Sequence, residues 1–185
     1  VTLPVTSIQR GFFFRGPSGA YWGIAIATGD INGDNITDLV FSGYNQVIIV
    51  FPSKTANYSL GQTSIPNSIQ FKLLGWSFAT GDINGDEFDE LVIGAYPALF
   101  NKTGRVYIVF GSSSIKSLTI SSSSTPDGTT WSRINGNIVF GSFGHSLGVV
   151  HGITGTSDDI VVAAYDGFKL NSMGYHIRRQ ICKKM

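Results

Sequence analysis

Several features that would mark a familiar protein class are scarce in this sequence. There is one cysteine, Cys182, so no disulfide can form within the chain, and cysteine usage leaves the compartment open. Charged residues make up 14% of the chain and the formal net charge is +1, which predicts no affinity for nucleic acid or acidic membrane surfaces. No apolar run approaches the ~18 residues of a membrane span. Any membrane association would therefore come from sequence outside this chain.

The two ends of the chain also lack recognisable signals. The sequence begins "VTLPVTSIQ", without the charged and apolar regions of a signal peptide, and we interpret it as a processed or partial chain. Basic residues cluster only near the other end, where we expect residues 178–185 to form a frayed basic tail. Three Asn-x-Ser/Thr sequons, at Asn35, Asn57 and Asn101, favour a secreted glycoprotein.

Glycine and aromatic residues, by contrast, are abundant. The chain has 23 glycines, and aromatic residues make up 12% of it, with little charge between them. This composition favours many short strands joined by turns over amphipathic helices. At 185 residues the chain is long enough for one domain with a sizeable core, so we expect an all-β domain.

A repeat organises most of the chain. The octapeptide "ATGDINGD" occurs at 27–34 and again at 79–86, and the segments 22–44 and 74–96 around it align without a gap at an offset of 52 residues. A fainter third copy, "FGHSLGVVHGITGTSDDIVVAAY" at 143–165, follows the second at an offset of 69. Repeats of this length indicate units that bury their faces by stacking on one another. The predicted units are 21–73, 74–134 and 140–177.

Each unit has the pattern of short strands separated by turns. Four short antiparallel strands per unit are typical of a propeller blade. A two-sheet sandwich would also use short strands, but it would not require the same loop at the same point of each unit. We therefore expect a partial β-propeller made of about three four-stranded antiparallel blades. The expected strands cover 23–28, 39–44, 46–51 and 69–74; 76–80, 91–96, 104–110 and 130–135; and 145–150, 160–165 and 173–177.

These units resemble the FG-GAP repeat of integrin α-chain propellers, which also occurs in glycosylphosphatidylinositol-specific phospholipase D. The resemblance covers about 21–177, with two strong units and one degenerate unit, although none of them carries the family's final proline. The matching elements are Trp22-Gly23 with Ser42-Gly43-Tyr44, Leu74-Gly75 with Gly94-Ala95-Tyr96, and Phe143-Gly144 with Ala163-Ala164-Tyr165.

The resemblance implies a ring of about seven blades, which three units do not complete. We expect the remaining propeller blades or a partner subunit to cover the open strand edges. The resemblance also implies that loops on the face opposite the repeated "GDINGD" loops bind a protein or glycan ligand. Candidate loops for that role are 45–46, 98–104 and 166–172.

The repeated loop is a candidate Ca²⁺ site. Side-chain oxygens alternate along nine residues and the seventh position can add a main-chain carbonyl, which together supply the hard oxygen ligands that Ca²⁺ prefers. In the FG-GAP family the corresponding loop binds Ca²⁺, so the resemblance implies the same. The predicted ligands are Asp30, Asn32, Asp34, the carbonyl of Ile36 and Asp38 in the first loop, and Asp82, Asn84, Asp86, the carbonyl of Phe88 and Glu90 in the second.

Two other interpretations of the loop are weaker. Asx-turns would explain one or two carboxylates, but three within nine residues would repel one another by about 1 kcal/mol per close pair without a cation. An EF-hand needs a bidentate Glu at position twelve, where this chain has Phe41 and Ile93, and its flanks would be helical. We therefore predict two Ca²⁺ sites.

The third unit is predicted to be metal-free. Its ungapped register places His151, Ile153 and Gly155 at the first three ligand positions and retains only Asp159. A one-residue slip would not restore the ligands. Loss of the ligands with retention of the strands indicates that the metal supports the blade and takes no part in chemistry.

One motif points to an enzyme instead. "GHSLG" at 144–148 matches the nucleophile elbow, and Ser146, Asp159 and His176 follow in hydrolase order. An elbow needs a helix after the serine, whereas the residues that follow are rich in Gly and Thr, and Gly144 is already explained by the repeat. We expect no catalytic residues in this chain.

The expected function is a non-catalytic, Ca²⁺-stabilised module for cell-surface or extracellular binding and adhesion. The alternative is the propeller portion of a glycosylphosphatidylinositol-specific phospholipase D-like enzyme whose catalytic domain is absent from this chain.

Overall fold

The computed structural model describes eight segments of the chain, and within them it contains strands and no helix. The described residues are 23–43, 46–52, 68–71, 75–95, 103–120, 124–136, 142–152 and 155–164. The strands are β1 (Ile26–Gly29), β2 (Asp38–Gly43), β3 (Gln46–Val50), β4 (Ser68–Phe71), β5 (Ser77–Gly81), β6 (Glu90–Ala95), β7 (Arg105–Val109), β8 (Trp131–Asn135), β9 (Ser146–His151) and β10 (Asp158–Ala163).

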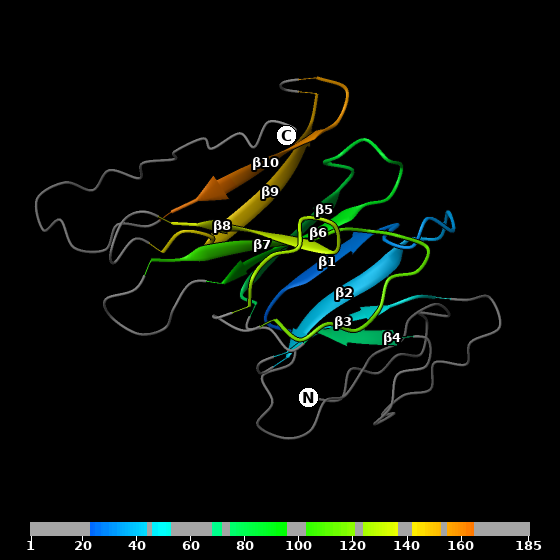
Figure 1. The fold of residues 1–185 in the computed structure, drawn as a ribbon, viewed down its shortest axis with the longest axis horizontal. Coiled ribbons are helices and arrows are strands. Elements are labelled where there is room, and N and C mark those ends of the chain that lie inside the picture. Colours follow the sequence, from blue (N-terminus) through cyan, green and yellow to red (C-terminus); the bar gives the residue numbers. More distant parts are fainter. Residues whose placement is uncertain are drawn as a thin grey trace, which may run out of the picture.

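The strands form three antiparallel sheets in chain order (Figure 1). The first two sheets are four-stranded meanders, β1-β2-β3-β4 and β5-β6-β7-β8, and they confirm the four-stranded units predicted from the repeat. The third sheet pairs β9 with β10. The strand predicted over 173–177 lies outside the described residues.

Strand pairing confirms the alignment of the three units. Gly29 lies opposite Asp38 in the first sheet and Gly81 lies opposite Glu90 in the second, which preserves the offset of 52 residues in space. In the third sheet Val150 lies opposite Asp159, as the ungapped offset of 69 requires. A one-residue slip in the third unit would have paired different residues, so the ungapped register holds.

The near-continuous apolar runs of β2 and β6 follow from burial on both faces. In β6, Leu91 and Ile93 belong to the core cluster shared with the first sheet, whereas Val92 belongs to the cluster shared with the third sheet. In β2, Val40 faces the second sheet, while Phe41 belongs to a separate cluster on the other face. β6 therefore contributes to two interfaces between sheets, whereas the second cluster of β2 consists of residues of the first sheet alone.

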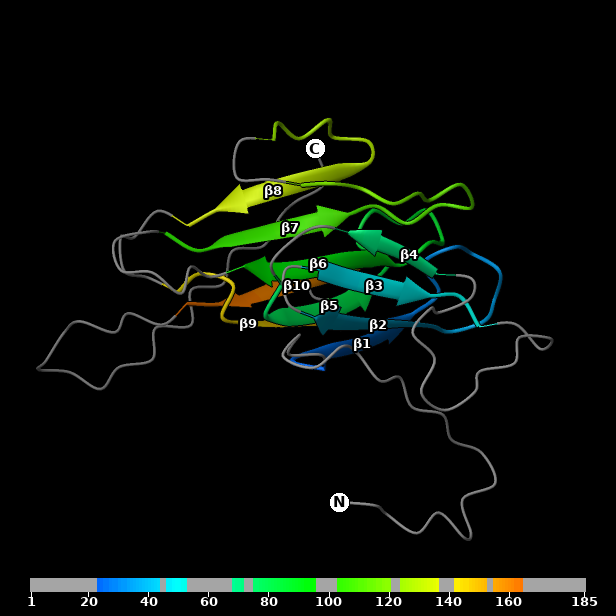
Figure 2. The same cartoon turned by 90° about the horizontal axis from the view of Figure 1, so that it is seen from below.

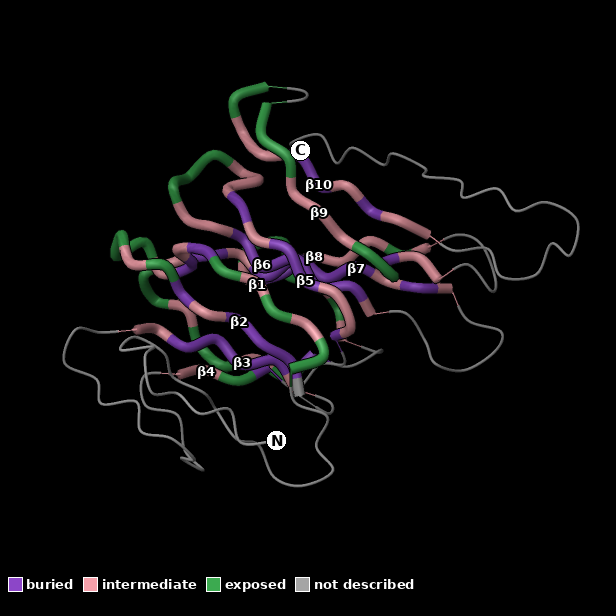
Figure 3. The backbone as a smooth tube through the Cα atoms, turned by 180° about the vertical axis from the view of Figure 1, so that it is seen from behind, coloured by how far each residue is buried: buried purple, intermediate pink, exposed green. Residues whose placement is uncertain are grey.

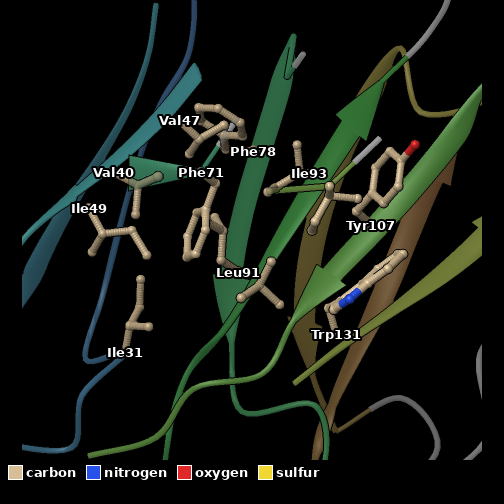
Figure 4. Close-up of a cluster of buried hydrophobic side chains, with 12 residues drawn as sticks. Ile31, Val40, Val47, Ile49, Phe71, Phe78, Leu91, Ile93, Tyr107 and Trp131 are labelled. Carbon is tan, nitrogen blue, oxygen red and sulfur yellow. The ribbon is translucent and has the colours of Figure 1, made fainter. Parts of the chain in front are cut away.

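Two apolar clusters join the sheets face to face. The cluster between the first and second sheets contains Trp131, which packs against Tyr107 with ring centroids 6.0 Å apart (Figure 4). Trp131 therefore belongs to the apolar cluster shared by the first and second units. The cluster between the second and third sheets includes the buried residues Ala79, Val92, Val106, Ile108, Ile160 and Val162.

The sheets are arranged so that their first strands meet. β1 contacts β5 and β5 contacts β9. The three sheets follow one another in chain order in Figure 1, and in Figure 2, where they overlap, β1, β5 and β9 lie toward the same side. The loops after β1 and β5 lie on the same side of this stack (Figure 1), and their tips, residues 33–35 and 85–87, are exposed (Figure 3). The repeated oxygen-rich loops therefore share one face of the protein.

Candidate metal centre

The two oxygen-rich loops are built on the same hydrogen-bond framework, which starts at their first aspartate. Asp30 Oδ1 accepts hydrogen bonds from the main-chain N–H groups of Gly33 (2.8 Å) and Asp34 (3.0 Å), and Asp30 Oδ2 accepts one from Asn35 (2.7 Å). Asp82 repeats these bonds: Oδ1 accepts from Gly85 (2.6 Å) and Asp86 (3.1 Å), and Oδ2 accepts from Glu87 (3.1 Å).

The middle of the first loop brings two predicted ligands into contact. Asn32 Nδ2 donates to Asp34 Oδ2 at 3.1 Å, and the Asp34 N–H donates back to Asn32 Oδ1 at 3.0 Å. Asp34 Oδ1 also accepts from the N–H of Ile36 at 2.8 Å, which fixes the residue whose carbonyl is a predicted ligand.

The second loop repeats two of these three contacts. Asn84 Nδ2 donates to Asp86 Oδ2 at 2.8 Å, and the N–H of Phe88 donates to Asp86 Oδ1 at 3.0 Å. Asn84 Nδ2 lies in addition 3.2 Å from Glu90 Oε1, so in this loop the amide touches two predicted carboxylate ligands.

The last acidic residue of each loop, Asp38 or Glu90, is the first residue of the following strand and is fully buried. Asp38 Oδ2 accepts from the N–H groups of Ile31 (2.9 Å) and Asn32 (3.3 Å). Glu90 Oε2 accepts from Ile83 (2.8 Å) and Asn84 (3.2 Å), so its longer side chain makes the same pair of bonds.

Burial dominates the electrostatics of these two carboxyl groups. Burial raises the pKa of Asp38 to about 7; the hydrogen bonds from Ile31 and Asn32 oppose this rise, and the charges of Asp34 and Asp30 add to it. The pKa of Glu90 is likewise raised to about 7, chiefly by burial, with the charge of Asp86 contributing. Each loop therefore holds a carboxyl group whose charge is costly unless a cation lies close by.

The oxygen atoms of both loops are of the kinds that bind a hard divalent cation. Asp38 Oδ1 in the first loop and Asn84 Oδ1 in the second are buried and have no hydrogen-bond partner, so each loop keeps a buried oxygen that a cation could use. Carboxylate, amide and carbonyl oxygens are the ligands of Ca²⁺. Among the described residues, no three His, Cys, Asp or Glu side chains lie close enough together to form a metal cluster as they stand. The predicted ligand sets stay predictions.

The third loop is different at its first position. His151 Nδ1 lies 2.7 Å from Asp158 Oδ1, so a histidine–aspartate contact occupies the place of Asp30 and Asp82. Asp159 is buried like Asp38 and Glu90, whereas Gly155 is exposed and Ile153 lies outside the described residues.

The geometry of the third sheet is incompatible with the nucleophile elbow that "GHSLG" suggests. Ser146 is the first residue of β9, and no helix follows it within the described residues. Ser146 pairs with Ala163 at one end of the β9–β10 hairpin, whereas Asp159 pairs with Val150 near the other end, about 13 Å away at strand spacing. His176 lies outside the described residues.

Sequence reasoning missed Asp89, which reaches from the second unit to the first loop. Its Oδ2 accepts a hydrogen bond from the N–H of Asp30 at 2.8 Å. Burial raises its pKa, and the hydrogen bond from Asp30 opposes that rise. The available signal was the recurrence of an aspartate before the last acidic residue, at Asp89 and Asp158.

Comparison with known proteins identifies the repeat. Residues 74–109 match the sequence model of the FG-GAP repeat. The chain is 28% identical over 158 residues to integrin alpha-V of Gallus gallus, a match that covers 80% of this chain and 14% of that protein. It is 35% identical over 78 residues to phosphatidylinositol-glycan-specific phospholipase D of Rattus norvegicus, covering 40% of this chain and 8% of that protein. The chain thus spans a small part of both curated relatives.

The comparisons bear out the resemblance seen in the sequence. The matched segment includes the second oxygen-rich loop and strands β5, β6 and β7. Across the part of the chain that the structure describes, no helix is long and apolar enough to cross a membrane. Most of the loops proposed for ligand binding, residues 98–102 and 166–172 among them, lie outside that part.

Proposed function

Because residues 74–109 of this chain are an FG-GAP repeat, we propose that the chain is a non-catalytic β-propeller module that binds Ca²⁺ in the loops after β1 and β5. Three antiparallel sheets stacked in chain order support the propeller arrangement, with one blade per sheet. The remaining blades of the ring, or a partner subunit, would complete the structure.

The observation that carries the Ca²⁺ proposal is the repetition of one framework in two loops. In both loops the first aspartate accepts hydrogen bonds from the same three main-chain N–H groups, and the asparagine side chain donates to the second aspartate. Both loops also bury the final carboxylate against their own N–H groups. A turn that served only to reverse the chain would not need a buried carboxyl with a raised pKa in each copy.

The energetic role of the metal would be modest. Ca²⁺ sites of extracellular modules have dissociation constants of about 10⁻⁴–10⁻³ M. At about 1 mM Ca²⁺ each occupied loop would then stabilise the folded chain by about 0.4–1.4 kcal/mol. That energy is enough to hold a loop and its two strands in place. It would be lost where free Ca²⁺ is scarce, so we place the module at a cell surface or outside the cell.

The proposed activity of the module is adhesion or binding. Integrin alpha-V supports this role, since its match extends over 80% of the chain. A protein or glycan ligand, bound by loops on the face opposite the Ca²⁺ loops, is the proposed partner. The match to the phospholipase D is shorter, at 40% of the chain, and does not favour the alternative of an enzyme's propeller portion.

Calorimetric titration of the chain with Ca²⁺ tests the proposal. We expect two sites, one of which disappears in Asp34→Ala and the other in Asp86→Ala, and none in the double variant. Glu87→Gln is a matched control, because it neutralises an exposed acid of the second loop that lies outside the predicted ligand set. A stoichiometry near zero, or two sites that survive the double substitution, would contradict the proposal.

A further inference from the structure

The first oxygen-rich loop is held by residues of the second unit. The main-chain N–H of Asp89 donates to the carbonyl oxygen of Asp30 at 3.0 Å, and Asp89 Oδ2 accepts from the N–H of Asp30 at 2.8 Å. Both main-chain groups of the first predicted ligand are thereby fixed by one residue that lies 59 positions further along the chain.

Gly29 leaves the space that this contact needs. A Cβ atom built on Gly29 would overlap Asp89 Oδ2 and the side chain of Thr80, so a larger residue would displace the Asp89 carboxylate. The φ angle of Gly29 is not positive, so the backbone itself would accept another residue. The close approach of Asp89, together with that of Thr80, is thus what calls for glycine at this position.

Two further contacts tie the same loop to the second unit. The ring of Phe88 packs directly over Gly33, whose φ of 73° and missing side chain make room for it. The N–H of Ser112 donates to the carbonyl of Ile31 at 3.0 Å. Residues of the second unit therefore contact the first loop at Asp30, Ile31 and Gly33.

The segment Phe88–Asp89–Glu90 serves both loops at once. Phe88 supplies a predicted carbonyl ligand and Glu90 a predicted carboxylate ligand in the second loop, whereas the Phe88 ring and the Asp89 carboxylate contact the first loop. If Ca²⁺ binding in one loop shifted this segment, the contacts of the segment with the other loop would change as well.

Half of this arrangement recurs between the second and third units. The N–H of Asp158 donates to the carbonyl of Asp82 at 2.8 Å, as Asp89 does to Asp30. The carboxylate of Asp158 is instead paired with His151 at 2.7 Å. We call the pair of hydrogen bonds between Asp89 and Asp30 the clamp. The second loop has only the first of the two bonds, so it can be compared with the first loop within the same chain.

The geometry points to Asp89 as a positioning residue for the metal loop of the preceding unit, so that Ca²⁺ binding in the first loop depends on the stacking of the second unit against it. This inference rests on the Ca²⁺ binding proposed above. Asp89 is not a ligand in this scheme. It acts by holding the main chain of Asp30, as partners of metal ligands commonly do.

Titration of single-loop proteins tests the inference. In the whole chain carrying Asp86→Ala, only the first loop should bind Ca²⁺, and adding Asp89→Ala should weaken that site about tenfold or more. Asp89→Asn should keep most of the affinity, because its amide oxygen can accept the same bond from Asp30. Gly29→Ala should weaken the site as Asp89→Ala does, although it removes no charge. In the Asp34→Ala background, Asp89→Ala should change the second loop far less.

A second measurement needs no metal. Amide hydrogen exchange at Asp30 in the Ca²⁺-free chain should be faster in Asp89→Ala and in Gly29→Ala than in the parent, and close to the parent in Asp89→Asn. The exchange rate reports on the hydrogen bonds between Asp89 and Asp30 directly. If the Asp86→Ala parent binds no Ca²⁺, the Ca²⁺ proposal fails, but this measurement still tests whether Asp89 positions Asp30.

Two results would overturn the inference. Unchanged first-loop affinity in both Asp89→Ala and Gly29→Ala would show that the clamp does not position the loop. Equal losses in Asp89→Asn and Asp89→Ala, with none in Gly29→Ala, would show that the charge of Asp89 matters and its position does not.

Discussion

Position 87 illustrates how two near-identical loops differ in local strain. Glu87 has a φ of 71° and its equivalent in the first loop, Asn35, has a φ of 59°. Asparagine adopts this left-handed conformation readily, whereas for glutamate it costs about 1 kcal/mol or more. We therefore expect Glu87→Asn to raise the free energy of unfolding by about 0.5–1 kcal/mol, measured by urea denaturation in Ca²⁺-free buffer.

The control for this prediction is Glu87→Ala. It removes the same charge but keeps a side chain that is strained at positive φ, so it should give no such gain. A gain of equal size in both variants would show that the charge of Glu87 is responsible and the backbone is not.

Asp127 illustrates a turn held by one carboxylate. Its Oδ1 accepts hydrogen bonds from the N–H groups of Thr130 (2.6 Å), Thr129 (2.9 Å) and Trp131 (3.1 Å), the last of which begins β8. These bonds favour the charged form, and they hold the pKa of Asp127 well below its usual range.

The depressed pKa fixes the sign of a pH effect. Asp127 contributes stability above its unfolded pKa of about 3.9, and that contribution is lost as the pH falls toward its folded pKa. The urea midpoint of the wild-type chain should therefore exceed that of Asp127→Asn at pH 6, and the difference should shrink at pH 2.5. A difference that stays constant over this range would contradict the assignment.

At the scale of the strand, the second and third sheets meet through glycine. A Cβ atom on Gly94, in β6, would overlap the carbonyl oxygen of Gly144 and the hydroxyl of Ser77, which itself donates to Gly144 at 2.8 Å. The repeat places Ser42 at the same position of the first unit. We nevertheless expect Gly94→Ser to lower the free energy of unfolding by about 2–3 kcal/mol in urea denaturation, because overpacking against backbone is hard to relieve.

Gly148 is the matched control for that prediction. It also lies in a strand, β9, but a Cβ atom there would meet nothing within 4 Å. Gly148→Ala should therefore change the stability by no more than about 0.5 kcal/mol. Equal losses in the two variants would show that strand glycines matter here for some reason other than close packing.

Elements were predictable where their determinants are local. The apolar runs that became β2 and β6 and the alternating runs that became β3 and β7 are set by burial of their own side chains, and the repeat supplied their pairing. The alternating oxygens of "GDINGD" likewise foretold a loop organised around its aspartates. The clamp by Asp89 was not predictable, because the recurrence of an aspartate at Asp89 and Asp158 does not reveal that the Asp89 carboxylate reaches a residue 59 positions earlier. The strain at Glu87 was hidden for a related reason, since only the backbone angle reveals it.

At the scale of the whole molecule, the loops and the sheet interfaces form one system. The first loop places the fully buried Ile31 in the core cluster between the first and second sheets, and the main chain of its first aspartate is bonded to the second unit. Ordering the loop therefore orders part of an interface. This link explains how ions bound at one face could stabilise contacts along the stack.

Removal of Ca²⁺ should accordingly be visible in global unfolding. If both loops are filled at about 1 mM Ca²⁺, chelation with EGTA should lower the free energy of unfolding by about 1–3 kcal/mol and the melting temperature by several degrees. Asp34→Ala combined with Asp86→Ala should remove this difference, whereas Glu87→Gln should preserve it. Mg²⁺ at the same concentration should restore less stability, because it demands a tighter octahedral geometry than a flexible loop of carboxylate and carbonyl oxygens supplies. A melting temperature that is indifferent to EGTA would mean that the buried carboxyls of Asp38 and Glu90 are held by the protein alone.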